Sequence, residues 1–244
     1  MICGGATLMA EWTSVIQGLS ARYTNVLNDL HDDYIHTGTL GRDIQVSVLR
    51  RKRKLKVVNP ITKSEVNGIE LANKAHSAIL RLGNRCFKDI VAQVELFVTE
   101  LIRFWLHKHP GLISEKAITV AVLFASPTLE DAQNAAVEEA IDSTISDKMY
   151  GRPEKWFAYL KKNLGVQFAV QDELDFVEMK ARRDVLEHNN GIIEAVYSQK
   201  AKNASKYVMG VQVQITDQDI DDAYQLVKRL IREASEVVIA KSNL

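Results

Sequence analysis

Long stretches in which apolar residues recur at steps of three and four constrain the fold of this chain more than any other feature. Between Glu11 and His36 this spacing places Trp12, Leu19 and Leu27 on one side of a helix. Proline, the strongest helix breaker, occurs only four times among 244 residues. We therefore expect an all-α protein that folds as a helical bundle.

The same periodicity divides the chain into a series of expected helices. Gly38 and Gly41 are expected to break the first of them, and Ser126 is expected to cap the third. The second reads as one long helix or as two collinear helices with a break at Gly83. The expected helices cover residues 11–36, 64–109, 126–148, a segment from Pro153, 171–190 and 216–241.

Two segments alternate apolar and polar residues, which is typical of a short β ribbon. They are residues 43–58 and 208–215. The first also contains five consecutive basic residues, so an extended ribbon and a basic helix both fit it, while residues 114–124 fit a short helix or a strand. We expect residues 1–60 to form an N-terminal helix plus basic segment, packed on a main helical domain of residues 61–244.

The run of five basic residues suits contacts with an RNA backbone. It suits a solvated loop equally well, because no aromatic side chains interleave with it for base stacking. Across the whole chain 31 Lys and Arg balance 31 Asp and Glu, which gives a net charge of zero. Any binding of nucleic acid must therefore come from a local site rather than from a broad positive field. The residues of the run are Arg50, Arg51, Lys52, Arg53 and Lys54.

Cysteine usage and the absence of common motifs narrow the class of protein. Only Cys3 and Cys86 occur, without a CxxC pair, which argues against a disulfide scaffold or a structural zinc site. The first residues lack the pattern of a signal peptide, and no apolar run approaches the roughly 20 residues of a membrane span. The chain has no Walker loop, GxGxxG or GxSxG motif. We expect a cytoplasmic protein that has no membrane association, no cofactor and no metal.

The expected helix at 171–190 carries the residues of greatest chemical interest. Its apolar stripe ends at His188, close to the C-terminal end of the helix, where the helix dipole favours an imidazolium. Asp184 lies one turn earlier and could hold the imidazole in one tautomer. A histidine in this setting suits general acid–base chemistry. The stripe consists of Leu174, Val177, Ala181, Val185 and His188.

Arg183 lies about 140° around this helix from His188, on a different side. Phe176, Met179 and Leu186 make that far side apolar as well. A homodimer that packs these helices about a two-fold axis would bury the second apolar side and gather two arginines and two histidines in one cleft. In the simpler interpretation, the histidine is a hydrogen-bonded core residue and the arginine belongs to a solvated face.

The segment 175–193 resembles the signature of HEPN domains, the higher-eukaryote and prokaryote nucleotide-binding helical bundles. The family's mark is an arginine, a polar residue, a short spacer and a histidine at the end of a helix, here Arg183, Asp184, three residues and His188. The segments 151–157 and 95–109 also resemble the family's layout, and the likeness extends over roughly residues 60 to 240. Asp184 stands where asparagine is common, so an acceptor replaces an amide donor.

This resemblance implies a metal-independent endoribonuclease that acts as a homodimer, of the kind found among toxins with a partner antitoxin and among antiviral-defence effectors. In that chemistry His188 transfers a proton and Arg183 binds the scissile phosphate. Asp184 would orient His188, while Arg182 and Asn189 would bind phosphate and tighten the site. The alternative is a non-catalytic HEPN module for protein interaction or nucleotide binding within a defence or regulatory complex.

Overall fold

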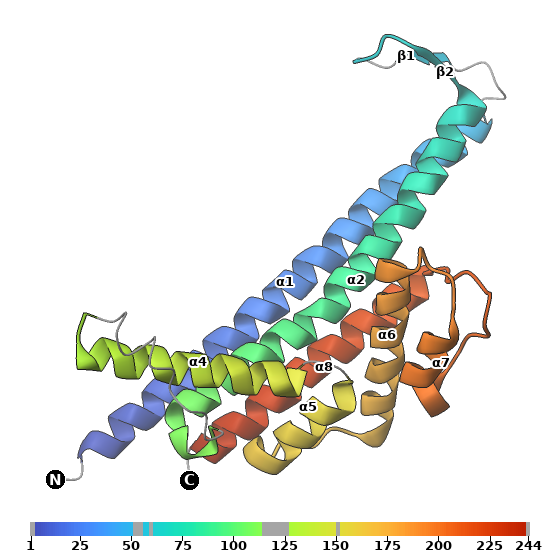
Figure 1. Cartoon of the computed structure of the whole chain (residues 1–244). Coiled ribbons are helices and arrows are strands. Elements are labelled where there is room, and N and C mark those ends of the chain that lie inside the picture. The colour runs from blue at the N-terminus through green and yellow to red at the C-terminus, as the bar shows by residue number, and fades with distance from the viewer. Residues whose placement is uncertain (1–2, 51–55, 59–60, 114–126, 150–151, 243–244) are drawn as a thin grey trace. The chain divides into compact units, whose positions relative to one another are not determined.

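The computed structural model of the chain describes residues 3–50, 56–58, 61–113, 127–149 and 152–242 (Figure 1). Helices dominate this part of the chain, and the predicted all-α helical class is confirmed. Among the described residues, no helix is both long and apolar enough to cross a lipid bilayer. The helices are α1 (Cys3–Arg50), α2 (Gly68–Lys108), α4 (Leu129–Met149), α5 (Pro153–Tyr159), α6 (Val170–His188), α7 (Ala195–Ala201) and α8 (Asp217–Ser242).

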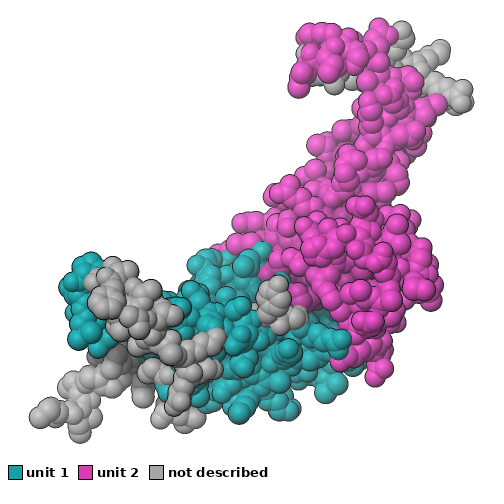
Figure 2. Space-filling model, viewed as in Figure 1, with its two compact units in different colours: residues 1–23, 93–177, 229–244 teal, residues 24–92, 178–228 magenta. Residues whose placement is uncertain are grey.

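The chain divides into two compact units, each assembled from segments that are distant in the sequence (Figure 2). The predicted division at residue 60 stays a prediction, and it is not one of the boundaries of these compact units. The boundaries fall inside α1, α2, α6 and α8 instead, because each of these helices contributes residues to both units. Unit 1 contains residues 1–23, 93–177 and 229–244, and unit 2 contains residues 24–92 and 178–228.

The core of unit 1 is built around the second half of α2, where Phe97, Leu101 and Leu106 are almost fully buried. This agrees with the wide apolar stripe of that segment. Aromatic rings fill the space between α5 and α6, since Trp156 lies edge-to-face against Phe176 with ring centroids 5.3 Å apart. Edge-to-face packing adds a favourable quadrupole interaction to the burial of both rings.

In unit 2, residues 24–50 of α1 and residues 68–92 of α2 run side by side in opposite directions (Figure 1). The predicted break at Gly38 and Gly41 is wrong, because α1 continues to Arg50. A Cβ atom at Gly41 would lie only 2.9 Å from Cγ1 of Ile79 on α2. Glycine at this position therefore permits the close approach of the two helices rather than ending one of them.

The two segments expected to be extended are only partly so. Residues up to Arg50 are helical, and strand β1 (Lys56–Val58) pairs antiparallel with strand β2 (Glu65–Asn67). Residues 208–215 do not form a strand; a single bridge joins Ile192 to Gln212. Residues 191–193 and 210–213 also exchange backbone N–H to carbonyl hydrogen bonds, so these backbone groups find partners without a sheet. The segment 114–124 lies outside the described residues.

Side-chain caps account for the starts of two helices. Thr216 Oγ1 accepts from the backbone N–H of Asp219 at 3.1 Å, and Asp219 accepts in return from the backbone N–H of Thr216 at 2.9 Å. This reciprocal capping box confirms the predicted start of α8. Thr128 caps α4 in the same way through the N–H of Asp131, whereas the predicted cap, Ser126, lies outside the described residues.

Replacement of Trp156 by alanine should destabilise the protein by about 3–5 kcal/mol, because the removal of a fully buried indole leaves a cavity among aromatic rings. Urea unfolding followed by circular dichroism measures the loss. The control is Val170→Ala, at a side chain that is 74% exposed, and it should change stability by no more than about 0.5 kcal/mol. Equal losses in both variants would contradict the packing described for unit 1.

Candidate functional site

The C-terminal end of α6 is held by an ordered turn within unit 2. Asn190 and Gly191 both have positive φ angles, 52° and 82°. The Gly191 N–H donates to the carbonyl of Val185 at 3.1 Å, and the Gly191 carbonyl accepts from the N–H of Val213 at 2.8 Å. A left-handed pair of this kind ends a helix and satisfies its last carbonyls. The end of the helix is therefore a defined position for the side chains next to it.

Arg183 and Asp184 meet a lysine that the sequence did not point to. Arg183 Nη1 lies 3.1 Å from Asp184 Oδ1, and Lys200 Nζ, from α7, lies 2.6 Å from Asp184 Oδ2. Lys180 adds a third positive charge near this carboxylate. Three cations thus surround one anion, and the Arg183 side chain remains 26% exposed. We call Lys180, Arg183, Asp184 and Lys200 the cationic cluster.

The protonation of Asp184 follows from these contacts. Burial alone would raise the pKa of its carboxyl, but the hydrogen bonds from Lys200 and Arg183 and the charges of Lys180 and Lys200 outweigh burial and hold that pKa below its usual range. The carboxylate is therefore ionised and occupied by cations. One of its oxygens contacts Arg183 and the other contacts Lys200, and its role in orienting His188 stays a prediction.

His188 is the last residue of α6, and its side chain is exposed. The predicted apolar stripe is correct through its middle, where Val177, Ala181 and Val185 are buried, but it does not bury the histidine. Five residues separate His188 from Arg183, which corresponds to about 140° around the helix and about 7.5 Å along it. Within one chain, the two side chains therefore leave α6 on different sides.

Arg182 is placed very differently from its neighbour. Its side chain is 1% exposed and is held by Glu178, with Nη2 3.1 Å from Oε2, and by an ion pair with Asp219 of α8. The guanidinium also lies over the ring of Phe87, 4.7 Å from its centroid. The phosphate-binding role predicted for Arg182 is therefore corrected. Its guanidinium is enclosed by two carboxylates and has no access to RNA.

The other predicted site residues are Asn189, which follows α6, and the basic run from Arg50 to Lys54. Asn189 donates through Nδ2 to Glu194 Oε2 at 3.1 Å, so it ties the turn after α6 to the start of α7. Arg50 is exposed at the end of α1. The remaining basic residues of that run, Arg51 to Lys54, lie outside the described residues.

The second apolar side of α6 is already covered within the chain. Phe176 is fully buried against Trp156, and Met179 is 3% exposed. The prediction that a dimer partner covers this side is therefore wrong. Exposed apolar residues lie instead in the turns beside the end of α6, and we call them the apolar turn. They are Ile192, Val208, Met209 and Val211, with exposed fractions of 44%, 71%, 71% and 42%.

The apolar turn was missed because residues 208–215 were expected to form a strand, and Lys200 was missed because α7 was not predicted. Its seven residues are too few to show a clear apolar period, and only Tyr197 and Ala201 are buried. The burial of Arg182 could be inferred from its neighbours in the sequence. Glu178 precedes it by four residues, and the apolar Met179 and Val185 lie three residues before and after it.

Among the described residues, no group of three or more His, Cys, Asp or Glu is arranged to hold a metal ion.

The two adjacent arginines should differ sharply in their contribution to stability. Arg182→Ala leaves Glu178 buried with only the more distant Lys206, 3.8 Å away, and should cost about 3–5 kcal/mol. Arg183→Ala removes a partly exposed contact and should cost no more than about 1 kcal/mol. Urea unfolding of both variants measures the difference. Similar losses, or a larger loss at Arg183, would contradict the placement of the two side chains.

The lowered pKa of Asp184 predicts a dependence of stability on pH. A carboxyl with a lower pKa in the folded state stabilises the fold fully above its unfolded pKa, about 3.9, and loses that contribution as pH falls through the folded value. Asp184→Asn should therefore lose stability at neutral pH and flatten the decline below about pH 4. Urea unfolding over a pH series measures both slopes, and an unchanged slope would contradict the pairing with Lys200.

Known proteins provide no guide to the function of this site. No family model matches the chain, and no curated protein and no solved structure matches it either. The site must therefore be judged on its own chemistry: a partly exposed arginine within a cationic cluster, an exposed histidine at the end of the same helix, and an apolar turn beside it.

Proposed function

We propose that this chain is a metal-independent endoribonuclease of the HEPN type, with Arg183 and His188 as its catalytic residues. The observation that carries the proposal is that both side chains of the Arg–polar–x3–His motif are accessible at one end of α6, while the adjacent Arg182 is sealed in the core. The accessible arginine is the one that the motif specifies.

The cationic cluster suits the binding of a phosphodiester. Arg183 uses one of its five N–H donors on Asp184, so other donors of the guanidinium are available to phosphate oxygens. Lys200, which is 41% exposed, supplies a second positive charge through the same carboxylate. Asp184 thus acts as a positioning residue that holds two cations together. A fixed cation next to the scissile phosphate stabilises the charge that accumulates on its oxygens during transfer.

The chemistry of RNA itself completes the reaction. The ribose 2′-hydroxyl gives up its proton to a base as its oxygen attacks the phosphorus, the bond to the 5′-oxygen breaks, and the leaving oxygen takes up a proton from an acid. His188 serves this step as the general acid or base. The products are a 2′,3′-cyclic phosphate and a 5′-hydroxyl. Water exchanges the proton that His188 does not transfer.

A homodimer brings the two catalytic side chains into one site. Within one chain, Arg183 and His188 diverge by about 140°, so a single copy does not align them on one phosphate. The apolar turn, whose parts are joined by the bridge between Ile192 and Gln212, follows the end of α6 and exposes four apolar side chains, which is typical of a surface that binds a partner. A two-fold contact through this turn places one copy's His188 near the other's α6. The homodimer serves as a toxin or antiviral-defence effector.

Incubation of the purified protein with RNA in EDTA tests this proposal. The wild type should cleave, and His188→Ala and Arg183→Ala should each slow cleavage by about 100-fold or more. The matched control is His36→Ala, at an exposed histidine of α1, which should keep the wild-type rate. A 2′-deoxy substitution at the scissile nucleotide should block the reaction. Absence of cleavage by the wild type, or full activity of His188→Ala, would overturn the proposal.

A mixing experiment tests whether the site combines two copies. Arg183→Ala and His188→Ala, each inactive alone, should regain activity when combined, because mixed dimers contain one site with both residues intact. Met209→Asp should yield a monomer by light scattering and abolish cleavage, since it places a charge in the apolar turn. Failure of the mixture to recover activity would place the whole site within one chain.

The contact between Arg183 and Asp184 favours one alternative. Because a carboxylate already neutralises part of the arginine's charge, the same helices could serve as a non-catalytic HEPN module within a defence or regulatory complex. An inactive wild type whose apolar turn still mediates association would support this second function. Restoration of cleavage by Asp184→Asn, which supplies the amide common in the family, would support the ribonuclease function instead.

A further inference from the structure

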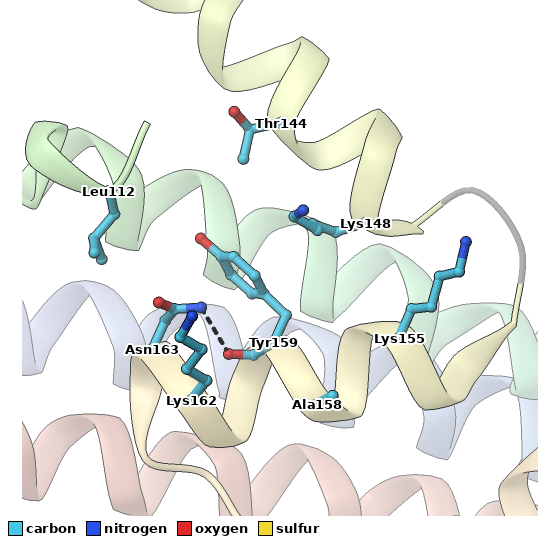
Figure 3. A pocket seen from close by; sticks show the side chains of 8 residues that line it. All are labelled: Leu112, Thr144, Lys148, Lys155, Ala158, Tyr159, Lys162 and Asn163. Carbon is cyan, nitrogen blue, oxygen red and sulfur yellow. Dashed lines mark hydrogen bonds between the residues drawn. The ribbon is translucent and has the colours of Figure 1, made fainter. Parts of the chain in front are cut away.

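Unit 1 contains a pocket of about 350 Å³ (Figure 3). This volume lies at the lower end of the range for small-molecule sites in proteins. The wall on one side comes from α4, and the wall on the other comes from α5 and the π-helical turn Leu160–Leu164 that follows it. The side chains that matter here are Leu112, Lys148, Lys155, Tyr159, Lys162 and Asn163.

Three lysines border this pocket and no acidic residue does. Lys148 comes from α4, Lys155 from α5 and Lys162 from the π-helical turn, and all three line the pocket (Figure 3). Within the described chain, none of the three forms an ion pair. Ammonium groups around one opening repel each other unless an anion lies among them. The charge therefore indicates a ligand with several negative charges.

A buried hydroxyl points to the same conclusion. The Tyr159 ring projects from α5 toward α4 (Figure 3), and its hydroxyl oxygen is shielded from water without a hydrogen-bond partner in the described structure. Burial raises the pKa of Tyr159, so the hydroxyl stays protonated and remains a donor. A shielded polar group without a partner costs free energy that a bound acceptor would recover.

The backbone of the second wall is also unusual. The helix widens to a π-helical turn at Leu160–Leu164, which ends at Gly165 with a φ angle of 76°. Such turns are rare and frequently occur at functional sites. This one carries Lys162 and Asn163 to the pocket, and the Asn163 amide donates to the Tyr159 carbonyl at 3.1 Å. An irregular turn that presents a cation and an amide to the same opening is consistent with a binding site.

We propose that this pocket binds a soluble small molecule with two or three linked phosphate groups. Lys148, Lys155 and Lys162 neutralise the phosphates, and the Tyr159 hydroxyl donates to one of their oxygens. Leu112 and Ala158 give the pocket an apolar part for the organic portion of the ligand. The pocket belongs to unit 1, whereas Arg183 and His188 belong to unit 2, so the proposal does not depend on ribonuclease activity.

Isothermal titration of the full chain with inorganic tripolyphosphate, pyrophosphate and orthophosphate at constant ionic strength tests this site. Tripolyphosphate should bind one to one and more tightly than orthophosphate, because it contacts more of the lysines. The double variant Lys155→Gln with Lys162→Gln should weaken binding by about tenfold or more. Tyr159→Phe, which keeps the ring and removes the hydroxyl, should weaken binding by about five- to tenfold.

The matched control is Lys161→Gln, which removes the same charge from an exposed neighbour of Lys162 outside the pocket. It should keep the wild-type affinity. Thermal melts should confirm that all variants fold and that tripolyphosphate raises the melting temperature of the wild type. Any one of three results would overturn the proposal. These are no tripolyphosphate binding at about 1 mM, a loss of affinity in Lys161→Gln equal to that in the double variant, and displacement of tripolyphosphate by a short single-stranded RNA.

Discussion

The buried ion pairs of Arg182 are the interaction on which the rest of unit 2 depends. Its guanidinium lies over a ring of α2, beside Glu178 on its own helix and against Asp219 at the start of α8. Two fully buried charges and a partly buried third are costly unless each finds its partner, so this arrangement tolerates little change in the register of α6 against α8. Tyr197 extends it by donating to Glu178 at 2.8 Å, which anchors α7 to the same centre.

This anchoring explains why a surface site can exist one residue further along. A helix turns by about 100° per residue, so the burial of Arg182 rotates Arg183 to the boundary between core and solvent. There it meets Lys200, which α7 can supply only because Tyr197 is fixed in the core. The position of the candidate catalytic arginine thus follows from the burial of its neighbour. An exposed helix without that anchor would leave both arginines solvated.

Much of the fold could be predicted from local sequence, and the failures share one physical cause. The helices α2, α6 and α8 were predicted because apolar periodicity and capping residues such as Thr216 are local properties. Gly41 was misread as a helix break because its function is to admit Ile79, which is 38 positions away in the sequence. The burial of Arg182 likewise depends on Asp219, and α7 has too little pattern to be seen. Tertiary contacts overrode local preference in each case.

The interleaved composition of the two units has a consequence for how the protein is made. Unit 2 needs the first half of α8, and unit 1 needs its second half, so a ribosome must synthesise α8 before either unit can close. Until then α1 and α2 have emerged with apolar faces that still lack a partner, a state in which chains are prone to aggregation.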